Sequence, residues 1–344
     1  MKVQVTDMID VKNLSKDYML KKKEPGLGGA VKGLLKSEYM PVHAVNNLSF
    51  TISEGEIVGF IGPNGAGKST TIKMMSGILT PTHGVVLIDG EDVTKNRKRV
   101  VRNIGVVFGQ RSQLNWDLRL GESFELLRHI YQIPQTEYEE TLETMDQILG
   151  IKEIIDKPVR QMSLGQRMKG DLVASMLHNP KVLFLDEPTI GLDVSTKFAL
   201  RKFIKDINRV RKTTVILTTH DLGDIQELCE RLIIINHGDL VEDGNLSEIV
   251  ERIAPYKTLV VEYYDEDAAE PEKCEMIDHT GNIARYRFQK RDTTAAQLIA
   301  EISSMKAIKD VSIEEAGIDD IIKIAYSKTK SCITCESYAG FYTC

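Results

Sequence analysis

The stretch GPNGAGKSTT, residues 62–71, sets three glycines and three hydroxyl side chains around a single lysine, Lys68. It directly follows the apolar run EIVGFI, residues 56–61, which predicts a short strand, and residues 70–79 predict a helix. A strand, a glycine-rich turn and a helix direct several backbone N–H groups to one point, where a phosphate can bind. The pattern matches G-x-x-x-x-G-K-[ST], the phosphate loop of proteins that bind nucleoside triphosphates.

The loop therefore predicts an ATP-binding site with Mg²⁺ as its cofactor. We expect Lys68 to reach the β- and γ-phosphates and the Ser69 hydroxyl to bind Mg²⁺. The residues expected to contact the nucleotide here are Gly62, Pro63, Asn64, Gly65, Ala66, Gly67, Lys68, Ser69 and Thr70. Kinases, GTPases and motor ATPases share this loop, so the loop alone leaves the reaction open.

Composition restricts the class of protein. The chain has 344 residues, of which 42% are apolar and 27% charged, as in globular proteins of about two domains. The net charge is −6, and all of the acidic excess falls in residues 245–344, so neither part resembles a basic nucleic-acid binder. Five cysteines without a signal peptide suggest a reducing cytoplasm, and no apolar stretch reaches the roughly 18 residues of a membrane span.

A pair of acids ends a second apolar run. In KVLFLDEPTIGLD, residues 181–193, the run at 182–185 lacks alternation and predicts a buried parallel strand that leads into Asp186 and Glu187. Removing two carboxylates from water in that position costs free energy unless a cation or a ligand binds to them. Beside a phosphate loop, Asp186 suits the Mg²⁺ shell and Glu187 suits polarising the attacking water. The alternative is a solvated acid pair before Pro188.

The segment VRQMSLGQRMKGDLVASMLHNP, residues 159–180, predicts a capped helix. Ser163 suits the N-cap position, and Met168, Leu172 and Met176 share one face of residues 167–177. The N-terminus of such a helix is a second potential anion site, although an ordinary capped helix would look the same.

Together these motifs resemble the ATP-binding subunit of an ATP-binding cassette (ABC) transporter, over residues 9–244. GPNGAGKST resembles the Walker A loop, VLFLDEP the Walker B strand with its following glutamate, MSLGQR the signature LSGGQ, and GLD the D-loop with Asp193. Gln110 resembles the Q-loop glutamine that also reaches Mg²⁺, His220 the switch histidine, and Tyr18 the aromatic residue that stacks on adenine.

The resemblance implies that two subunits close on two ATP molecules. The signature of one subunit, here Ser163, Leu164, Gly165 and Gln166, would then cover the ATP held by the other. Leu164 departs from the family, which has glycine there, and it changes the fit of this position more than its chemistry. Glu187, His220 and Lys68 would be the catalytic residues. The resemblance also implies separate membrane permease subunits as partners, no nucleic acid, and a place at the cytoplasmic face of the membrane.

Other segments lie outside the motifs. Residues 21–40 are rich in lysine and predict an insertion, either a solvated loop or a short amphipathic helix near lipid or permease. Trp116 is equally compatible with a core position and with a contact to the permease. The tail at 329–344, with Cys332, Cys335 and Cys344, suggests a disordered segment, and a zinc or redox site is the alternative.

These observations predict an α/β P-loop ATPase core at 1–244, a helical subdomain at about 111–180, and an accessory α+β domain at 245–328 that loosely resembles those of exporters. In that domain KTLVVEYY and ARYRFQKR predict strands, AAQLIAEISSM a helix, and residues 308–326 a strand and then a helix. The predicted function is ATP hydrolysis that drives transport, with export of drugs or polysaccharides favoured. The alternatives are a cytosolic cassette ATPase without a permease and a regulatory cassette. The transported substrate and the identity of the second cassette stay open.

Overall fold

The computed structural model describes residues 7–21, 39–109, 111–315 and 324. The chain divides into two compact units, Met1–Asp243 and Gly244–Cys344. Among the described residues, no helix combines the length and the apolar character that crossing a membrane requires.

A six-stranded sheet forms the centre of the first unit, in the order β10-β9-β3-β8-β7-β6. Neighbouring strands run parallel from β9 through to β6. Its strands are β3 Ile57–Ile61, β6 Ile104–Phe108, β7 Val182–Asp186, β8 Thr214–Thr218, β9 Arg231–Asn236 and β10 Asp239–Asn245. The predicted strands at 56–61 and 182–185 are confirmed as β3 and β7, and β8 lies beside both of them. β7 and β8 are buried on both faces, which explains their unbroken apolar runs.

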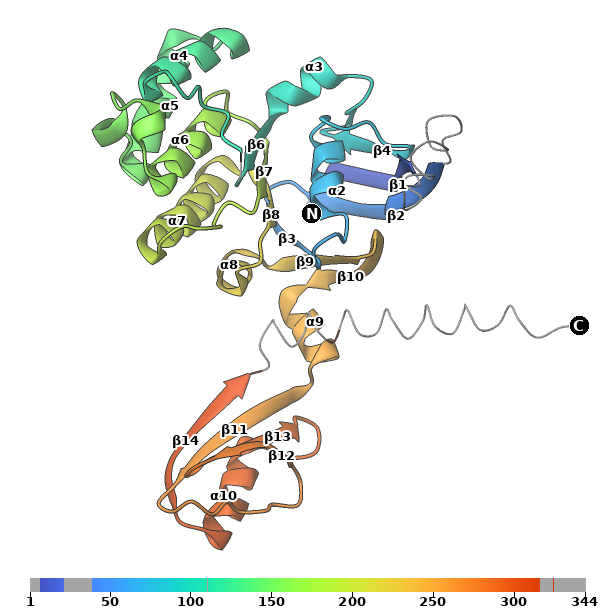
Figure 1. Cartoon of the computed structure of the whole chain (residues 1–344), viewed down its shortest axis with the longest axis vertical. Coiled ribbons are helices and arrows are strands. Elements are labelled where there is room, and N and C mark those ends of the chain that lie inside the picture. Colours follow the sequence, from blue (N-terminus) through green and yellow to red (C-terminus); the bar gives the residue numbers. More distant parts are fainter. Residues whose placement is uncertain (1–6, 22–38, 110, 316–323, 325–344) are drawn as a thin grey trace, which may run out of the picture. The chain divides into compact units, whose positions relative to one another are not determined.

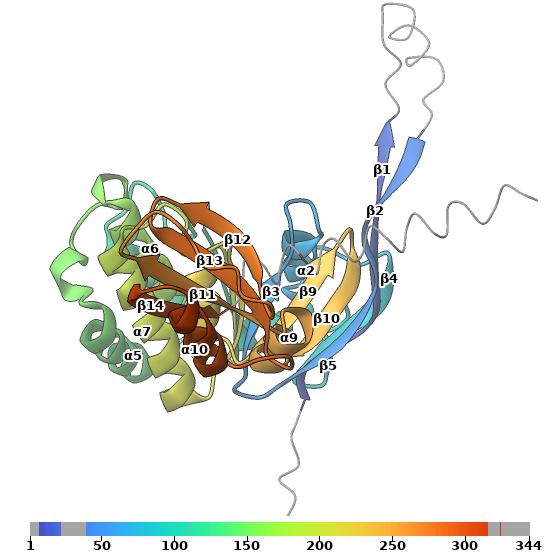
Figure 2. The same ribbon diagram turned by 90° about the horizontal axis from the view of Figure 1, so that it is seen from below.

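A second, antiparallel sheet has the order β2-β1-β4-β5. Its strands are β1 Asp7–Lys21, β2 Tyr39–Ser53, β4 His83–Ile88 and β5 Glu91–Asp92. The first two strands pair along their whole length, as far as Lys21 opposite Tyr39, and their far ends project beyond the sheet as a two-stranded ribbon (Figure 2). The predicted insertion at 21–40 is thus partly strand at its two ends, and residues 22–38 lie outside the described residues.

Helices cover the parallel sheet. Four of them gather on the side away from the antiparallel sheet (Figures 1 and 2), namely α4 Leu120–Tyr131, α5 Gln135–Leu149, α6 Leu164–Met176 and α7 Val194–Arg211. The shorter elements are α2 Lys68–Met75, α3 Arg97–Val100, η1 Val101–Asn103, η2 Lys152–Ile154, η3 Val159–Gln161 and α8 Leu222–Leu228. The first unit is therefore a mixed α/β fold, as the sequence predicts.

The helix after the phosphate loop differs from its predicted bounds of 70–79. It begins two residues earlier, because Gly67 adopts a left-handed conformation and lets the helix start at Lys68. It ends at Met75 because Gly77, with a φ of 70°, reverses the chain and donates its N–H to Met74 O at 3.1 Å.

The second unit holds a four-stranded antiparallel sheet in the order β12-β13-β11-β14. Its elements are α9 Leu246–Ile253, β11 Tyr256–Tyr263, β12 Glu275–Thr280, β13 Ile283–Gln289, α10 Ala295–Met305 and β14 Ile308–Glu315. The core contains Leu259, Phe288 and Ile302, and the buried hydroxyls of Tyr263 and Tyr286 lie 2.7 Å apart. The predicted strands and α10 are confirmed, and the helix predicted after β14 falls almost wholly outside the described residues. The sequence prediction missed β12, whose six residues are all exposed and show no apolar alternation.

Two phenylalanines on α7 test how far packing stabilises the first unit. Phe203 is fully buried, whereas Phe198 is 64% exposed on the same helix. We expect Phe203→Ala to lower the free energy of unfolding by about 3–5 kcal/mol, because it opens a cavity in the core. Phe198→Ala should change it by less than about 0.5 kcal/mol. Chemical denaturation of the two variants measures the difference, and equal effects would contradict the packing of α7.

Candidate active site

The register of the parallel sheet brings three loops together. Asp186 at the end of β7 pairs with Thr218 at the end of β8 and with Phe108 at the end of β6, and β3 pairs with β8 on the other side. In a parallel sheet all of these carboxyl ends lie along one edge, where ligands of such folds bind. The phosphate loop, Glu187 and His220 follow directly after these strands.

Close backbone contacts fix the phosphate loop. A Cβ on Gly62 would lie 2.4 Å from Ile235 O, and one on Gly67, whose φ is 104°, would lie 2.5 Å from Ala44 O. Both positions therefore require glycine. Lys68 is 6% exposed and donates from Nζ to Gly62 O at 2.6 Å and to Pro63 O at 3.1 Å. Its ammonium group thus lies inside the concave side of the loop.

Burial lowers the pKa of Lys68 below its ordinary value, and the negative charges of Glu187 and Asp186 act in the opposite direction. These two acids therefore stabilise the charged form of a desolvated lysine. A phosphate group in the loop would add further negative charge and favour that form still more.

Oxygen donors gather beside the loop. The Ser69 hydroxyl donates to Asp186 Oδ1 at 3.3 Å, and the Thr218 hydroxyl donates to the same oxygen at 2.6 Å. Ser69, Asp186 and Glu187 line one cavity of about 340 Å³. A carboxylate and a hydroxyl beside a phosphate site form the hard oxygen set that Mg²⁺ prefers, so the residues fit the predicted ion.

Glu187 and His220, two of the predicted catalytic residues, form a close pair. His220 Nε2 lies 2.8 Å from Glu187 Oε1. Glu187 has a φ of 55°, which is uncommon for a residue other than glycine, and its N–H holds this conformation by donating to Thr218 O at 2.9 Å and Thr218 Oγ1 at 3.1 Å. A carboxylate fixed in this way can accept a proton from a water molecule at the end of the phosphate site.

A buried acid, Asp224, forms hydrogen bonds with residues that neighbour Glu187 and His220 in the sequence. Asp224 on α8 is fully buried and accepts hydrogen bonds from Thr189 Oγ1 at 2.7 Å, Thr219 Oγ1 at 3.0 Å and Arg201 Nε at 2.6 Å. Thr189 follows Glu187 by two residues, and Thr219 precedes His220. Asp224 therefore joins the loop that contains Glu187 to the loop that contains His220. The sequence prediction did not single out Asp224.

The predicted signature caps a helix, as expected. Ser163 Oγ accepts from Gln166 N at 3.2 Å, and Gln166 Oε1 accepts from Ser163 N at 3.1 Å, which is a complete capping box. A Cβ on Gly165 would lie 2.9 Å from Thr196 Oγ1. Leu164 packs against Gly191. A Cβ added to Gly191 would lie 3.1 Å from Leu164 Cδ2. The leucine that departs from the family pattern thus fits against a glycine of the D-loop.

Asp193 begins α7 as its N-cap. It accepts from the hydroxyls of Ser195 at 2.5 Å and Thr196 at 2.7 Å, and from Thr196 N at 3.0 Å. These bonds, that of Ser195 foremost, hold the pKa of Asp193 well below its usual range. The side chain is therefore a charged group at the start of α7, close to the signature.

Tyr18 lies on the antiparallel sheet, which also contacts the phosphate loop. It is 39% exposed on β1 and pairs with Val42 of β2, two residues before Ala44, which contacts the loop at Gly67. Lys16 Nζ lies 5.6 Å from the centre of its ring. The side chain is thus accessible for stacking, and its role with adenine stays a prediction.

Several predicted residues lie outside this site or outside the described part of the chain. Gln110 and the tail with Cys332, Cys335 and Cys344 lie outside the described residues. In the part of the chain that is described, no group of three or more histidine, cysteine or acidic side chains could hold a metal ion. Trp116 is 52% exposed, and its ring centre lies 5.1 Å from the guanidinium carbon of Arg167, so it is not a core residue.

Asp171 on α6 is a residue that the sequence prediction missed. It is 5% exposed and accepts from Ser112 Oγ at 3.0 Å and from Gln113 N at 2.9 Å. Burial raises its pKa to about 6, although these hydrogen bonds and Arg167 favour the charged form. The available signal was an acid directly before Leu172, beside the apolar face of a predicted helix.

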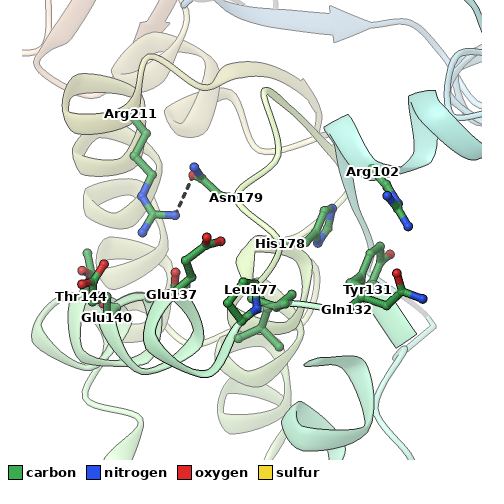
Figure 3. Close-up of a pocket in the computed structure, with 13 residues that line it drawn as sticks. Arg102, Tyr131, Gln132, Glu137, Glu140, Thr144, Leu177, His178, Asn179 and Arg211 are labelled. Carbon is green, nitrogen blue, oxygen red and sulfur yellow. Dashed lines mark hydrogen bonds between the residues drawn. The ribbon is translucent and has the colours of Figure 1, made fainter. Parts of the chain in front are cut away.

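A larger cavity of about 540 Å³ lies away from this site (Figure 3). Its walls come from η1, the facing ends of α4 and α5, the loop after α6 and the end of α7. Tyr131 and His178 stack there at 4.1 Å, and Arg211 donates to Asn179 Oδ1 at 2.9 Å (Figure 3). None of the predicted site residues lines it, so volume alone does not locate the chemistry.

The phosphate loop, the Ser69 hydroxyl beside the Asp186 carboxylate, and the contact between Glu187 and His220 lie at one edge of a parallel sheet. Together they define a P-loop nucleotide hydrolase. Comparisons narrow this class. Residues 45–190 match the family model described as ABC transporter. The ATP-binding cassette MJ0796, solved as a dimer in a post-hydrolysis state with ADP and Pi, is 26% identical with a TM-score of 0.58, and the match covers 70% of this chain and 99% of that one.

Three bacterial proteins illustrate the relatives. The ABC transporter ATP-binding protein NatA of Bacillus subtilis is 32% identical, over 61% of this chain and 85% of NatA. The uncharacterized ABC transporter ATP-binding protein YhcH of the same organism is 35% identical, over 80% and 88%. The methionine import ATP-binding protein MetN of Geobacillus kaustophilus is 31% identical, over 83% and 85%. The chain belongs to the family of ABC transporter ATP-binding proteins, and it is an ATP-binding, ATP-hydrolysing subunit of a transporter.

The raised pKa of Asp171 predicts a pH dependence of stability. Between pH 3.8 and about 6 the folded protein keeps a proton that the unfolded chain has lost, so this group makes the protein less stable as the pH rises through that window. Asp171→Asn cannot titrate. We expect its free energy of unfolding, relative to wild type, to rise by about 2–3 kcal/mol between pH 4 and pH 6 and then level off. Denaturation at several pH values measures this difference, and a flat difference would contradict it.

Proposed function

We propose that this chain hydrolyses ATP at sites shared between two copies of itself and thereby drives transport through separate membrane permease subunits. The observation that carries the proposal is the Glu187–His220 pair at 2.8 Å, next to Ser69 and Asp186 at the end of a phosphate loop. A protein that only bound ATP as a regulator would not need a fixed base beside its ion ligands. The intact pair thus supports hydrolysis over the regulatory alternative.

The roles of the side chains follow from their places. Lys68 and the N–H groups of the phosphate loop bind the β- and γ-phosphates, and Ser69 and Asp186 would hold Mg²⁺. Gln110 lies outside the described residues, and its motif alone makes it a third candidate ligand. When bound, the ion neutralises charge on the phosphate oxygens. Glu187 accepts the proton of the attacking water, while His220 orients the carboxylate and contacts the γ-phosphate.

The signature supports a site shared by two subunits. Ser163 is exposed at the N-terminus of α6, where the helix dipole and free N–H groups favour an anion. The phosphate of a second copy suits this position, and the similar cassette MJ0796 was solved as a dimer. We therefore place the γ-phosphate between Lys68 of one copy and Ser163 of the other.

We further propose that the complex works at the cytoplasmic face of the membrane and that it exports its substrate. Export rests on the resemblance of the motifs and the C-terminal unit to exporter cassettes. MetN, which by its name serves methionine import, matches 83% of the chain and supports the opposite direction. Inside-out vesicles that contain the permease separate the two directions, because ATP added outside drives uptake only by an exporter.

Glu187→Gln tests the base. The amide keeps the shape of the side chain but cannot accept the proton of water, so we expect hydrolysis to slow by roughly 10²–10⁴-fold while ATP still binds. Without hydrolysis, ATP should hold two copies together as a dimer in gel filtration. Nucleotide binding and turnover are measured on the same preparation. Loss of ATP binding would show that Glu187 has a structural role instead.

A mixture of two inactive variants tests the shared site. Lys68→Ala and Ser163→Arg should each be inactive, because two-fold symmetry repeats either defect in both sites. In a mixed dimer both defects fall in one site and leave the other intact. Mixing should therefore restore up to about a quarter of the wild-type ATPase rate, since about half of the dimers are mixed and each has one good site.

The control for this experiment is cross-linking of differently tagged copies, which shows whether mixed dimers form. If mixed dimers form and stay inactive, the signature does not act on the ATP of the other copy, or both sites must fire together. If Glu187→Gln forms no dimer with ATP, the second cassette is a different chain.

A further inference from the structure

A buried carboxylate joins the signature helix to the segment that follows Gln110. Asp171 lies eight residues after Ser163 on α6, about 12 Å along the helix axis. Its side chain accepts from Ser112 Oγ at 3.0 Å and from Gln113 N at 2.9 Å, and its backbone oxygen accepts from Gln113 Nε2 at 3.0 Å. Three hydrogen bonds thus connect one residue of α6 to two neighbouring residues of the segment.

Two further contacts involve the same face of α6. The guanidinium of Arg167, one helical turn before Asp171, lies 5.1 Å from the centre of the Trp116 ring. Leu114 is buried, and a Cβ on Gly170 would lie 2.9 Å from its Cδ1, so the segment packs directly on the helix backbone. Residues 112–116, here called the linker segment, therefore contact α6 through a charged, an apolar and a cation–π interaction.

The buried charge makes this attachment stiff. If the linker segment moved without α6, Asp171 would lose its donors while it stayed buried, and an unpaired buried carboxylate is strongly unfavourable. The lowest-energy motion is then one in which the helix and the segment move together. Ser163, at the start of the same helix, would follow that motion.

We propose that Asp171 is a positioning residue that makes the linker segment and the signature helix move as one body, so that a displacement beside Gln110 reaches Ser163. The inference rests on the proposed function for its purpose, since a shared ATP site is where Ser163 acts. A contact of the permease with Trp116 would use the same route. The connection itself is a property of the first unit and can be tested without ATP.

The chain's single tryptophan is a convenient probe, because Trp116 belongs to the linker segment. We expect Asp171→Ala to release the segment and to raise the acrylamide quenching constant of Trp116 fluorescence by up to about twofold without nucleotide, because this residue is already 52% exposed. Ser175→Ala is the matched control: it lies on the same helix, is buried, and donates only to Leu172 O of that helix at 2.7 Å. The control should leave quenching unchanged.

The same variants test the consequence for catalysis. Asp171→Ala should lower the kcat for ATP by about tenfold and leave KM within about twofold, because the groups that bind the nucleotide are intact. Asp171→Asn keeps an oxygen that can accept from Ser112 and Gln113, so it should recover most of both properties. A merely structural role would lower stability but would move neither the quenching nor the ratio of kcat to KM.

The outcomes separate the two proposals. Unchanged quenching in Asp171→Ala, or an equal change in Ser175→Ala, overturns the role of Asp171 whatever the ATPase activity is. An inactive wild type with quenching that responds to Asp171→Ala contradicts the proposed function and leaves the connection intact. Should Asp171→Ala fail to fold, Ser112→Ala removes one donor from the exposed side and should raise quenching by a smaller factor; no change there also overturns the proposal.

Discussion

The site depends on the register of three parallel strands. Because β7 and β8 place Asp186 opposite Thr218, the Thr218 hydroxyl donates to the carboxylate, and its backbone oxygen and hydroxyl hold the N–H of Glu187. A shift of one residue would turn these side chains to the other face of the sheet. The sheet therefore positions the proposed ion ligand Asp186, the proposed base Glu187 and the nearby His220.

Two local features are energetically unfavourable by themselves, and the surrounding parallel sheet holds them in place. Glu187 adopts a positive φ, and Lys68 is buried as a cation among backbone carbonyls. Such features persist where the surrounding structure determines them, and they concentrate at functional sites. Both lie within the phosphate site. The antiparallel sheet contributes a close backbone contact, between Ala44 and Gly67.

The sequence predicted features that depend on neighbouring residues and missed those that depend on distant ones. The phosphate loop, the buried strand before Asp186 and the Ser163 cap are local patterns, and the structure contains each of them. The bonds of Asp171 join residues 58 and 59 positions apart, so no short pattern reveals them. The contact of Leu164 with Gly191 is equally non-local, and β12 escaped because an exposed edge strand needs no apolar alternation.

The signature helix is held within its own subunit at two levels. At its N-terminus, Leu164 packs over Gly191 and Gly165 lies against Thr196, whose N–H and hydroxyl bind Asp193. In its middle, Asp171 binds the linker segment. A glycine at position 164 would lose the contact with the D-loop, so the departure from the family signature strengthens the first attachment. Displacing Ser163 alone would then disturb both the D-loop and the linker segment, which makes the helix a rigid link between these two parts of the site.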